Sequence, residues 1–234
     1  MMPKPEQLVL DLPARAASGR DDFFVAPSNA LAVRMLDSWP DWATGKLALC
    51  GPVASGKSHL VQVWAARSGG VVLPAEALAK QDIPTLAAAR AVAVEDVDRL
   101  AALPGTRRKK SEEALFHLHN RLLGAGGSLL VSGVEAPSRW DIALPDLASR
   151  LRAAQVALLE PPDDALLSAV LVKLFMDRQI TVSPDLIGYL LPRMERSFAA
   201  ARAMVAALDK AGLSKRRAIT PRLAGEVLRD RGAA

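Results

Sequence analysis

Short apolar runs alternate with helical patterns along most of the chain. The runs that have the length of buried β-strands are Leu47–Cys50, Gly70–Leu73, Ala91–Val94, Ser128–Ser132 and Val156–Leu159. The clearest helical pattern between them is Ser111–Leu123, where Ser111 is a candidate N-cap followed by Glu112 and Glu113. Strands that alternate with helices predict an α/β fold with a parallel sheet between helices. The ligand crevice of such a sheet forms at the carboxyl ends of its strands.

A phosphate-binding motif follows the first predicted strand. It fits G-x-x-x-x-G-K-[ST] and reads Gly51-Pro52-Val53-Ala54-Ser55-Gly56-Lys57-Ser58. A helical pattern begins at His59, so backbone N–H groups and a helix N-terminus face the expected anion. Lys57 is expected to neutralise the outer phosphates and Ser58 to hold Mg²⁺. We therefore predict that residues 51–59 bind ADP or ATP, and Ala54 stands where many such loops carry glycine.

Polar residues end the next two strands of the predicted core. Glu95 and Asp96 follow the third strand, where one acid can hold Mg²⁺ and its neighbour can orient the attacking water. In the common pattern aspartate precedes glutamate, so the reversed order here, with Glu95 at the metal, predicts slow hydrolysis by this chain alone. Ser132 ends the fourth strand, in reach of a γ-phosphate or the attacking water. The alternatives are two solvated acids and a structural serine.

Arg150 lies close before the last predicted strand, within Leu144-Pro145-Asp146-Leu147-Ala148-Ser149-Arg150-Leu151. An arginine that projects there can reach a nucleotide held by a neighbouring subunit, as an arginine finger. An arginine in a surface ion pair is the alternative. The basic run Arg107–Lys110 is predicted to be a solvated loop, with contact to a DNA backbone as the sharper hypothesis.

Composition narrows the possible classes of protein. The 234 residues are 50% hydrophobic, which suits one large domain or one and a half, and we expect no membrane span because every long apolar run is interrupted by charge. The N-terminal apolar patch is too short and too acidic for a signal peptide. Cys50 is the single cysteine, which excludes internal disulfides and cysteine zinc clusters and suits a cytoplasmic protein. The net charge of +5 permits contact with nucleic acid.

Taken together, these motifs resemble the AAA+ module of the DnaA family of bacterial replication initiators. The P-loop, the acidic strand end, Ser132, residues 144–151 and Leu159–Pro162 occur in the family's order, and residues 144–151 look most like Hda, its regulatory branch. The resemblance runs from about residue 20 to 230 and implies an αβα nucleotide-binding domain with a five-stranded parallel sheet over residues 20–160 and a helical lid over 161–234. The lid helices it implies are Asp163–Arg178, Pro184–Arg193, Ser197–Ala211 and Thr220–Asp230.

The same resemblance implies further contacts with the nucleotide. Phe23–Asn29 is similar to the segment that lies beside the adenine, which assigns Phe24 and Val25 to the cofactor site. The family's lid arginine, which touches the phosphates, falls by register on Ala199. Arg196 and Arg202 lie three residues to either side, and Arg202 is the favoured candidate.

The N-terminal tail, residues 1–19, resembles a ligand of the DNA sliding clamp. Gln7-Leu8-Val9-Leu10-Asp11-Leu12 is similar to the Q-L-x-L-x-L peptide of Hda and many replication proteins, in which leucines fill an apolar pocket and the glutamine amide anchors the chain. Gln7, Leu8, Leu10 and Leu12 are the expected contacts, and polar and small residues follow as a flexible tether. A short edge strand is the alternative.

The resemblance implies a negative regulator of replication initiation. Its partners would be DnaA and the sliding clamp (the β subunit of DNA polymerase III), with DNA contacted weakly or through the clamp, and association with a second copy stays open. The sequence passes the expected lid by only a few residues, so we expect no helix-turn-helix domain and no sequence-specific binding of duplex DNA. A DNA-remodelling or clamp-loader-like ATPase and a non-catalytic DnaA-like adaptor are the alternatives.

Overall fold

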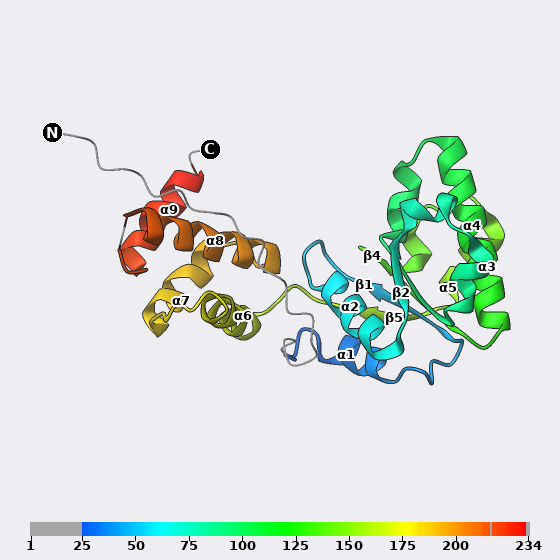
Figure 1. The fold of residues 1–234 in the computed structure, drawn as a ribbon, viewed down its shortest axis with the longest axis horizontal. Coiled ribbons are helices and arrows are strands. Elements are labelled where there is room, and N and C mark those ends of the chain that lie inside the picture. Colours follow the sequence, from blue (N-terminus) through cyan, green and yellow to red (C-terminus); the bar gives the residue numbers. More distant parts are fainter. Residues whose placement is uncertain (1–24, 216, 233–234) are drawn as a thin grey trace. The chain divides into compact units, whose positions relative to one another are not determined.

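The computed structural model describes residues 25–215 and 217–232, drawn in colour in Figure 1. The described chain divides into two compact units, one up to Pro161 and one from Pro162 onward. The first unit is an α/β layer structure and the second consists of helices. Among the described residues, the helices are all too short or too polar to cross a membrane.

The first unit is built on a five-stranded parallel sheet, as predicted. Its strands are β1 (Lys46–Cys50), β2 (Val71–Pro74), β3 (Ala91–Glu95), β4 (Ser128–Gly133) and β5 (Gln155–Leu158), in the spatial order β2-β3-β4-β1-β5. Each lies within two residues of a predicted apolar run. The strand β4 lies between β1 and β3, so it separates the strand that leads into the P-loop from the strand that carries the acids.

Helices cover both faces of this sheet. On one face α1 (Ala30–Asp37) and α2 (Lys57–Ser68) pack against alternate residues of the central strands, with Trp64 stacked on Trp42 at 5.6 Å between ring centres. On the other face lie α3 (Ile83–Ala88), α4 (Gly105–Gly124) and α5 (Pro145–Arg152). Short 3₁₀ segments, η2 (Ala75–Lys80), η3 (Val97–Ala102) and η4 (Pro137–Arg139), connect these elements.

The start of α4 differs from the prediction. The helix begins at Gly105, so Ser111 is an interior residue with no exposed surface and is not an N-cap. The run Arg107–Lys110 is therefore helical, and its assignment to a loop was wrong. Arginine and lysine are good helix formers, but these first turns carry almost no apolar residues, so the helical period is invisible there.

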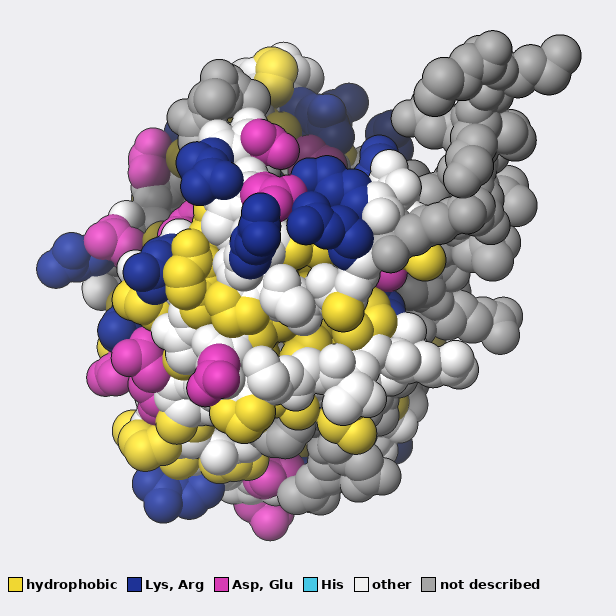
Figure 2. All heavy atoms as spheres, turned by 90° about the vertical axis from the view of Figure 1, so that its left-hand side faces the viewer, with side chains coloured by type: hydrophobic (Ala, Val, Ile, Leu, Met, Phe, Trp, Pro, Cys, Tyr) yellow, Lys and Arg dark blue, Asp and Glu magenta, His cyan; other side chains and the backbone are white. Residues whose placement is uncertain are grey.

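The second unit contains the helices expected of the lid, with ends shifted by a few residues. They are α6 (Asp164–Met176), α7 (Pro184–Leu190) with the 3₁₀ turn η5 (Leu191–Arg193), α8 (Phe198–Lys215) and α9 (Pro221–Gly232). Asp163 caps α6 by accepting a hydrogen bond from the Leu166 amide at 2.7 Å, and Phe175 has no exposed surface within the unit's own core. Figure 2 shows apolar side chains exposed on one face of the molecule. In the second unit Met176 is 67% exposed.

The end of β4 has no room for a side chain at Gly133. A Cβ atom there would lie 2.7 Å from the indole of Trp140, whose Nε1 donates to the Glu135 carbonyl at 2.6 Å. We predict that Gly133→Ala destabilises the protein by about 1–3 kcal/mol, because the indole or the strand must move. Thermal and denaturant unfolding will measure the change.

Gly124→Ala is the matched control. It lies in the last turn of α4, where an added Cβ would meet nothing within 4 Å. This substitution should leave the protein as stable as the parent or more stable by up to about 1 kcal/mol, since alanine is the better helix former. Equal stability of the two variants would contradict the packing assigned to Trp140.

Candidate functional site

The P-loop, Glu95 and Ser132 lie where three neighbouring strands, β1, β3 and β4, end. Leu49 of β1 pairs with Ser132 of β4, and the β3–β4 register that pairs Val94 with Val131 brings Glu95 beside Ser132. Side chains alternate between the faces of a strand, so Glu95 follows Ala93, and Ser132 follows Leu130, toward the layer of α2. The acid, the serine and the P-loop helix thus share one side of the sheet.

The P-loop runs from Gly51, at the end of β1, into the first turn of α2. A Cβ at Gly51 would lie 2.6 Å from the Leu159 carbonyl oxygen, so only glycine fits there. Gly56 is the N-cap of α2 with φ of 100°, a conformation that suits glycine. Ala54 also has a positive φ, 60°, which explains why glycine is common at this position. This backbone conformation destabilises an alanine by on the order of 1 kcal/mol.

Lys57 lies inside this loop. Its ammonium donates hydrogen bonds to the carbonyl oxygens of Gly51 at 2.6 Å and Pro52 at 2.8 Å, and the residue is 8% exposed. Burial lowers the pKa of Lys57, while the nearby carboxylates of Asp96 and Asp98 act in the opposite direction. The Lys57 ammonium therefore lies at the P-loop with two carboxylates nearby. This arrangement suits a phosphate group that contacts both the ammonium and a Mg²⁺ ion. Ser58 is exposed beside it and His59 is partly buried in the same helical turn.

Oxygen donors for Mg²⁺ are present at the same edge. The Ser58 hydroxyl lies in the first turn of α2, and Glu95 ends β3 on the same side of the sheet. Magnesium uses one or two protein oxygens together with nucleotide phosphates and water, so these donors fit the ion. In the part of the chain that the structure describes, no cluster of three or more His, Cys, Asp or Glu residues is placed to hold a metal without such a ligand.

Asp96 and Ser132 are joined directly. The Asp96 amide donates to the Ser132 hydroxyl oxygen at 3.1 Å, and Ser132 is 1% exposed. Asp96 has φ of 55° and its carboxylate lies 3.4 Å from Arg99 Nε. This contact links the acidic turn to β4, which gives Ser132 a structural role in addition to its predicted role at the nucleotide.

Asp98 belongs to the site but was not predicted. Its Oδ2 accepts a hydrogen bond from the Val134 amide at 2.8 Å, and the Val134 carbonyl in turn accepts one from the Gly51 amide at 3.0 Å. Its Oδ1 is buried with no hydrogen-bond partner among the described residues. The sequence signal was a third acid two residues after the Glu95-Asp96 pair, on the 3₁₀ turn η3.

Cys50 immediately precedes the P-loop and has no exposed surface. Burial raises the pKa of its thiol to about 12, with Lys57 opposing the shift and Asp98 adding to it. The side chain therefore stays a neutral thiol at physiological pH and serves as a small core residue of β1.

The segment before α1 lies beside the P-loop. The Glu160 amide donates to the Ser28 carbonyl at 3.2 Å, directly after Leu159, whose amide donates to the Cys50 carbonyl at 2.7 Å. Val25 is 61% exposed. Phe24 and the predicted clamp ligands Gln7, Leu8, Leu10 and Leu12 lie outside the described residues.

Arg150 lies beside the amino ends of the strands, whereas the P-loop lies at their carboxyl ends. It is in the last turn of α5, which ends where β5 begins, and its guanidinium lies 5.3 Å from the centre of the Phe116 ring. Burial, and then the nearby charge of Arg150, lowers the pKa of Lys46, the first residue of β1. The P-loop begins at Gly51, past the other end of β1 and roughly 16 Å from Lys46 along the strand.

The remaining basic candidates differ in their surroundings. Three side chains of Arg107–Lys110 have acidic partners: Glu76 for Arg107, Glu112 for Arg108 and Glu113 for Lys109. This pairing weakens the case for a DNA contact. In the second unit Arg196 pairs with Asp164 at 3.0 Å, whereas Arg202 is exposed on α8. The contact of Arg202 with phosphate stays a prediction.

Comparison with known proteins places the fold. No known protein-family model matches the sequence. Domain III of the replication initiation protein DnaA from Thermotoga maritima matches 94% of this chain and 98% of its own, with TM-score 0.74 and 17% identity. AMPPCP-bound DnaA from Aquifex aeolicus matches 86% of this chain and 67% of its own, with TM-score 0.69 and 18% identity. The FIGL-1 AAA domain in complex with ADP matches 80% of this chain and 72% of its own, with TM-score 0.57 and 15% identity.

These similarities confirm the predicted AAA+ fold. The chain spans about two thirds of the longer DnaA chains, 66% of one and 67% of another. Identities this low show the shared architecture only.

We predict that Lys57→Met weakens nucleotide binding by roughly tenfold or more, because a charge-assisted hydrogen bond to phosphate is worth about 1.5–3 kcal/mol. Methionine keeps most of the side-chain volume, so the loop should stay folded. Titration with fluorescent ADP and ATP analogues in the presence of Mg²⁺ measures the effect. Lys80→Ala, on the exposed end of η2, is the control and should bind as the parent does.

Proposed function

We propose that this chain is a nucleotide-bound AAA+ regulator of replication initiation that stimulates hydrolysis of ATP bound to DnaA. In this proposal the P-loop holds ADP or ATP with Mg²⁺ as a structural switch. Arg150 acts in trans on the nucleotide of DnaA, and the N-terminal tail docks the protein on the DNA sliding clamp. The reaction leaves DnaA with ADP and so opposes a further round of initiation.

The observation that carries the proposal is the position of Arg150. The helix turn that carries Arg150 ends beside the amino ends of the strands, whereas the P-loop begins at their carboxyl ends. Arg150 is therefore remote from the phosphates of a nucleotide held in the chain's own P-loop. The residue is exposed, which leaves the guanidinium accessible to a second molecule. A guanidinium at that position offsets the charge that develops on γ-phosphoryl oxygens, and such fingers raise rates by roughly 10³–10⁵.

Weak hydrolysis by the chain itself is consistent with the acids of its own site. Asp96, at the position that should orient water, lies within 3.4 Å of Arg99 and is held by its backbone to Ser132. The longer Glu95 occupies the position where a shorter aspartate usually holds the metal. Rapid turnover of ATP by the isolated chain would instead favour a DNA-remodelling ATPase.

The partners follow from chemistry and resemblance together. The DnaA-like fold supports an AAA+ neighbour with a nucleotide at the shared boundary. The clamp assignment rests on Gln7–Leu12 and its similarity to known clamp-binding peptides. In this proposal DNA is contacted weakly or through the clamp, and the reaction takes place in the cytoplasm.

We predict that Arg150→Ala abolishes most of the stimulation of DnaA-bound ATP hydrolysis while bound nucleotide and clamp binding persist. Lysine should not rescue the function, because its point charge lacks the planar fork of the guanidinium. The measurement is hydrolysis of labelled ATP preloaded on DnaA with DNA-loaded clamp present. Arg152→Ala is the matched control, since Arg152 is exposed in the same last turn of α5. If Arg150→Ala stimulates hydrolysis as well as the parent does, the arginine-finger hypothesis is wrong and the non-catalytic adaptor takes its place.

We also predict that Gln7→Ala combined with Leu10→Ala abolishes binding to the clamp and leaves nucleotide binding intact. The double variant removes the anchoring amide and one pocket-filling side chain. Surface binding to immobilised clamp measures the first property and nucleotide titration the second. Undiminished affinity for the clamp would show that the docking segment lies elsewhere.

A further inference from the structure

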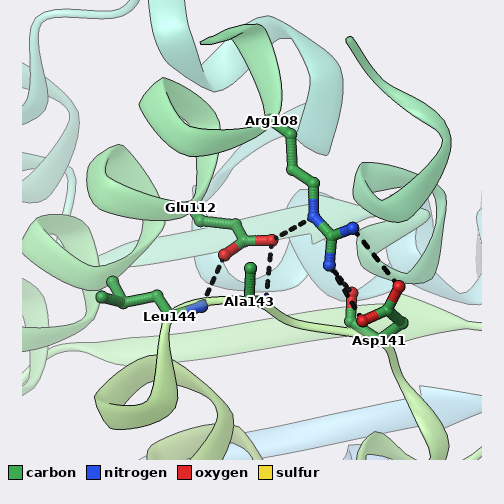
Figure 3. Close-up of polar contacts among 5 residues, drawn as sticks. All are labelled: Arg108, Glu112, Asp141, Ala143 and Leu144. Atoms are coloured by element: carbon green, nitrogen blue, oxygen red, sulfur yellow. Dashed lines mark hydrogen bonds and ion pairs between the residues drawn. The ribbon is translucent and has the colours of Figure 1, made fainter. Parts of the chain in front are cut away.

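Helix α5, which carries Arg150, is fastened at its start to α4 by one buried carboxylate. Figure 3 shows Glu112 of α4 pointing at the chain just before α5. Its Oε1 accepts from the Ala143 amide at 3.1 Å, and its Oε2 accepts from the Leu144 amide at 2.8 Å. Leu144 is the N-cap residue of α5, so Glu112 fixes the point at which this helix begins.

Arg108 completes the arrangement from one turn earlier on α4. Its Nε donates to Glu112 Oε1 at 2.9 Å, while its terminal nitrogens donate to the Asp141 carboxylate at 3.0 and 3.3 Å and to the Asp141 carbonyl at 2.6 Å. Arg108, Glu112 and Asp141 form the α4–α5 bracket. Glu112 is 2% exposed and Arg108 is 19% exposed, so the ion pair between them is little screened by water.

The same face of α4 also supports the far end of α5. Phe116 lies four residues after Glu112, one turn along the helix, and the guanidinium of Arg150 rests over its ring at 5.3 Å. The bracket fixes the first turn of α5 and the aromatic contact lies under the last. Because α5 has only eight residues, its start and its end move together as one rigid piece.

We propose that Arg108, Glu112 and Asp141 are positioning residues that set the orientation of α5 and thereby the direction in which Arg150 projects. This inference rests on the proposed function for its catalytic consequence. A finger must meet its phosphate within a fraction of an ångström, and small misplacements of catalytic groups cost as much as about 100-fold in rate. The bracket supplies that precision from outside the finger's own helix.

The chemistry of Glu112 gives a sharp variant. Both carboxylate oxygens face only donors: Arg108 Nε and the Ala143 amide at one, and the Leu144 amide at the other. Glutamine has nearly the same shape but carries one oxygen and one NH₂ group. In either orientation Glu112→Gln sets a donor against a donor, so at least one backbone amide loses its acceptor.

The first test is hydrogen exchange on the full chain. In Glu112→Gln we expect at least one of the backbone amides of Ala143 and Leu144 to exchange at least about tenfold faster than in the parent, because its acceptor is replaced by a donor. Asp141→Asn, a milder change at an exposed side chain, should give a smaller increase. Unchanged exchange at both amides in Glu112→Gln would overturn the bracket whatever the fate of the proposed function.

The second test is stimulated hydrolysis of ATP on DnaA with DNA-loaded clamp, as a function of the concentration of this protein. A misdirected finger lowers the maximal rate, whereas partial unfolding only reduces the competent fraction and is overcome by adding more protein. We expect Glu112→Gln to lower the maximal rate about tenfold with the half-saturating concentration unchanged. In the Arg150→Ala background the same substitution should have no further effect.

The matched control is Asp37→Asn. Arg67 donates to both the carbonyl and the carboxylate of Asp37 at 3.1 Å, as Arg108 does with Asp141, but this contact joins α2 to α1, away from α5. It should leave the maximal rate unchanged. If Arg150→Ala abolishes stimulation while Glu112→Gln and Asp141→Asn keep the full maximal rate, the positioning inference is wrong. If Arg150→Ala has no effect, the finger itself is wrong, and hydrogen exchange still decides on the bracket.

Discussion

The nucleotide site depends on where the Gly51 amide finds its acceptors. Gly51 donates to the carbonyls of Gly133 and Val134, so the first residue of the P-loop is tied to the end of β4. Two further hydrogen bonds form at the same end of β4: the Ser132 hydroxyl accepts one from the Asp96 amide, and the Val134 amide donates one to the Asp98 carboxylate. Only a parallel sheet with β4 between β1 and β3 brings these three chain ends together. A shift of β4 by one residue would separate the phosphate loop from its acids.

The fold could be predicted because its signals are local. The central strands β1, β3 and β4 are apolar runs buried on both faces, which is typical of parallel sheets, whereas the edge strands β2 and β5 are partly exposed. The P-loop has a fixed spacing of glycine, lysine and serine. The position of Arg150 just before the last strand could also be predicted, because the order of helices and strands determines at which end of the strands it lies. These features need no knowledge of distant side-chain contacts.

What was missed depends on tertiary contacts. The first turns of α4 are polar, and their helical form is stabilised by partners far away in the sequence, such as Asp141 for Arg108. Asp98 lies two residues after the Glu95-Asp96 pair, and only its contact with the backbone of Val134, thirty-six positions later, makes it part of the site. Glu112 was read as a residue of the first helical turn, yet its carboxylate is buried because three donors converge on it. Such roles follow from convergence in space, which periodicity does not encode.

The buried state of Cys50 has a consequence for how the protein responds to oxidants. Oxidation to sulfenic acid or a mixed disulfide begins with the thiolate, and a thiol with a pKa of about 12 and no exposed surface offers almost none. It is also the single cysteine of the sequence, so a second thiol within the chain cannot resolve it into a disulfide. Oxidants are therefore not expected to modify the strand that leads into the P-loop.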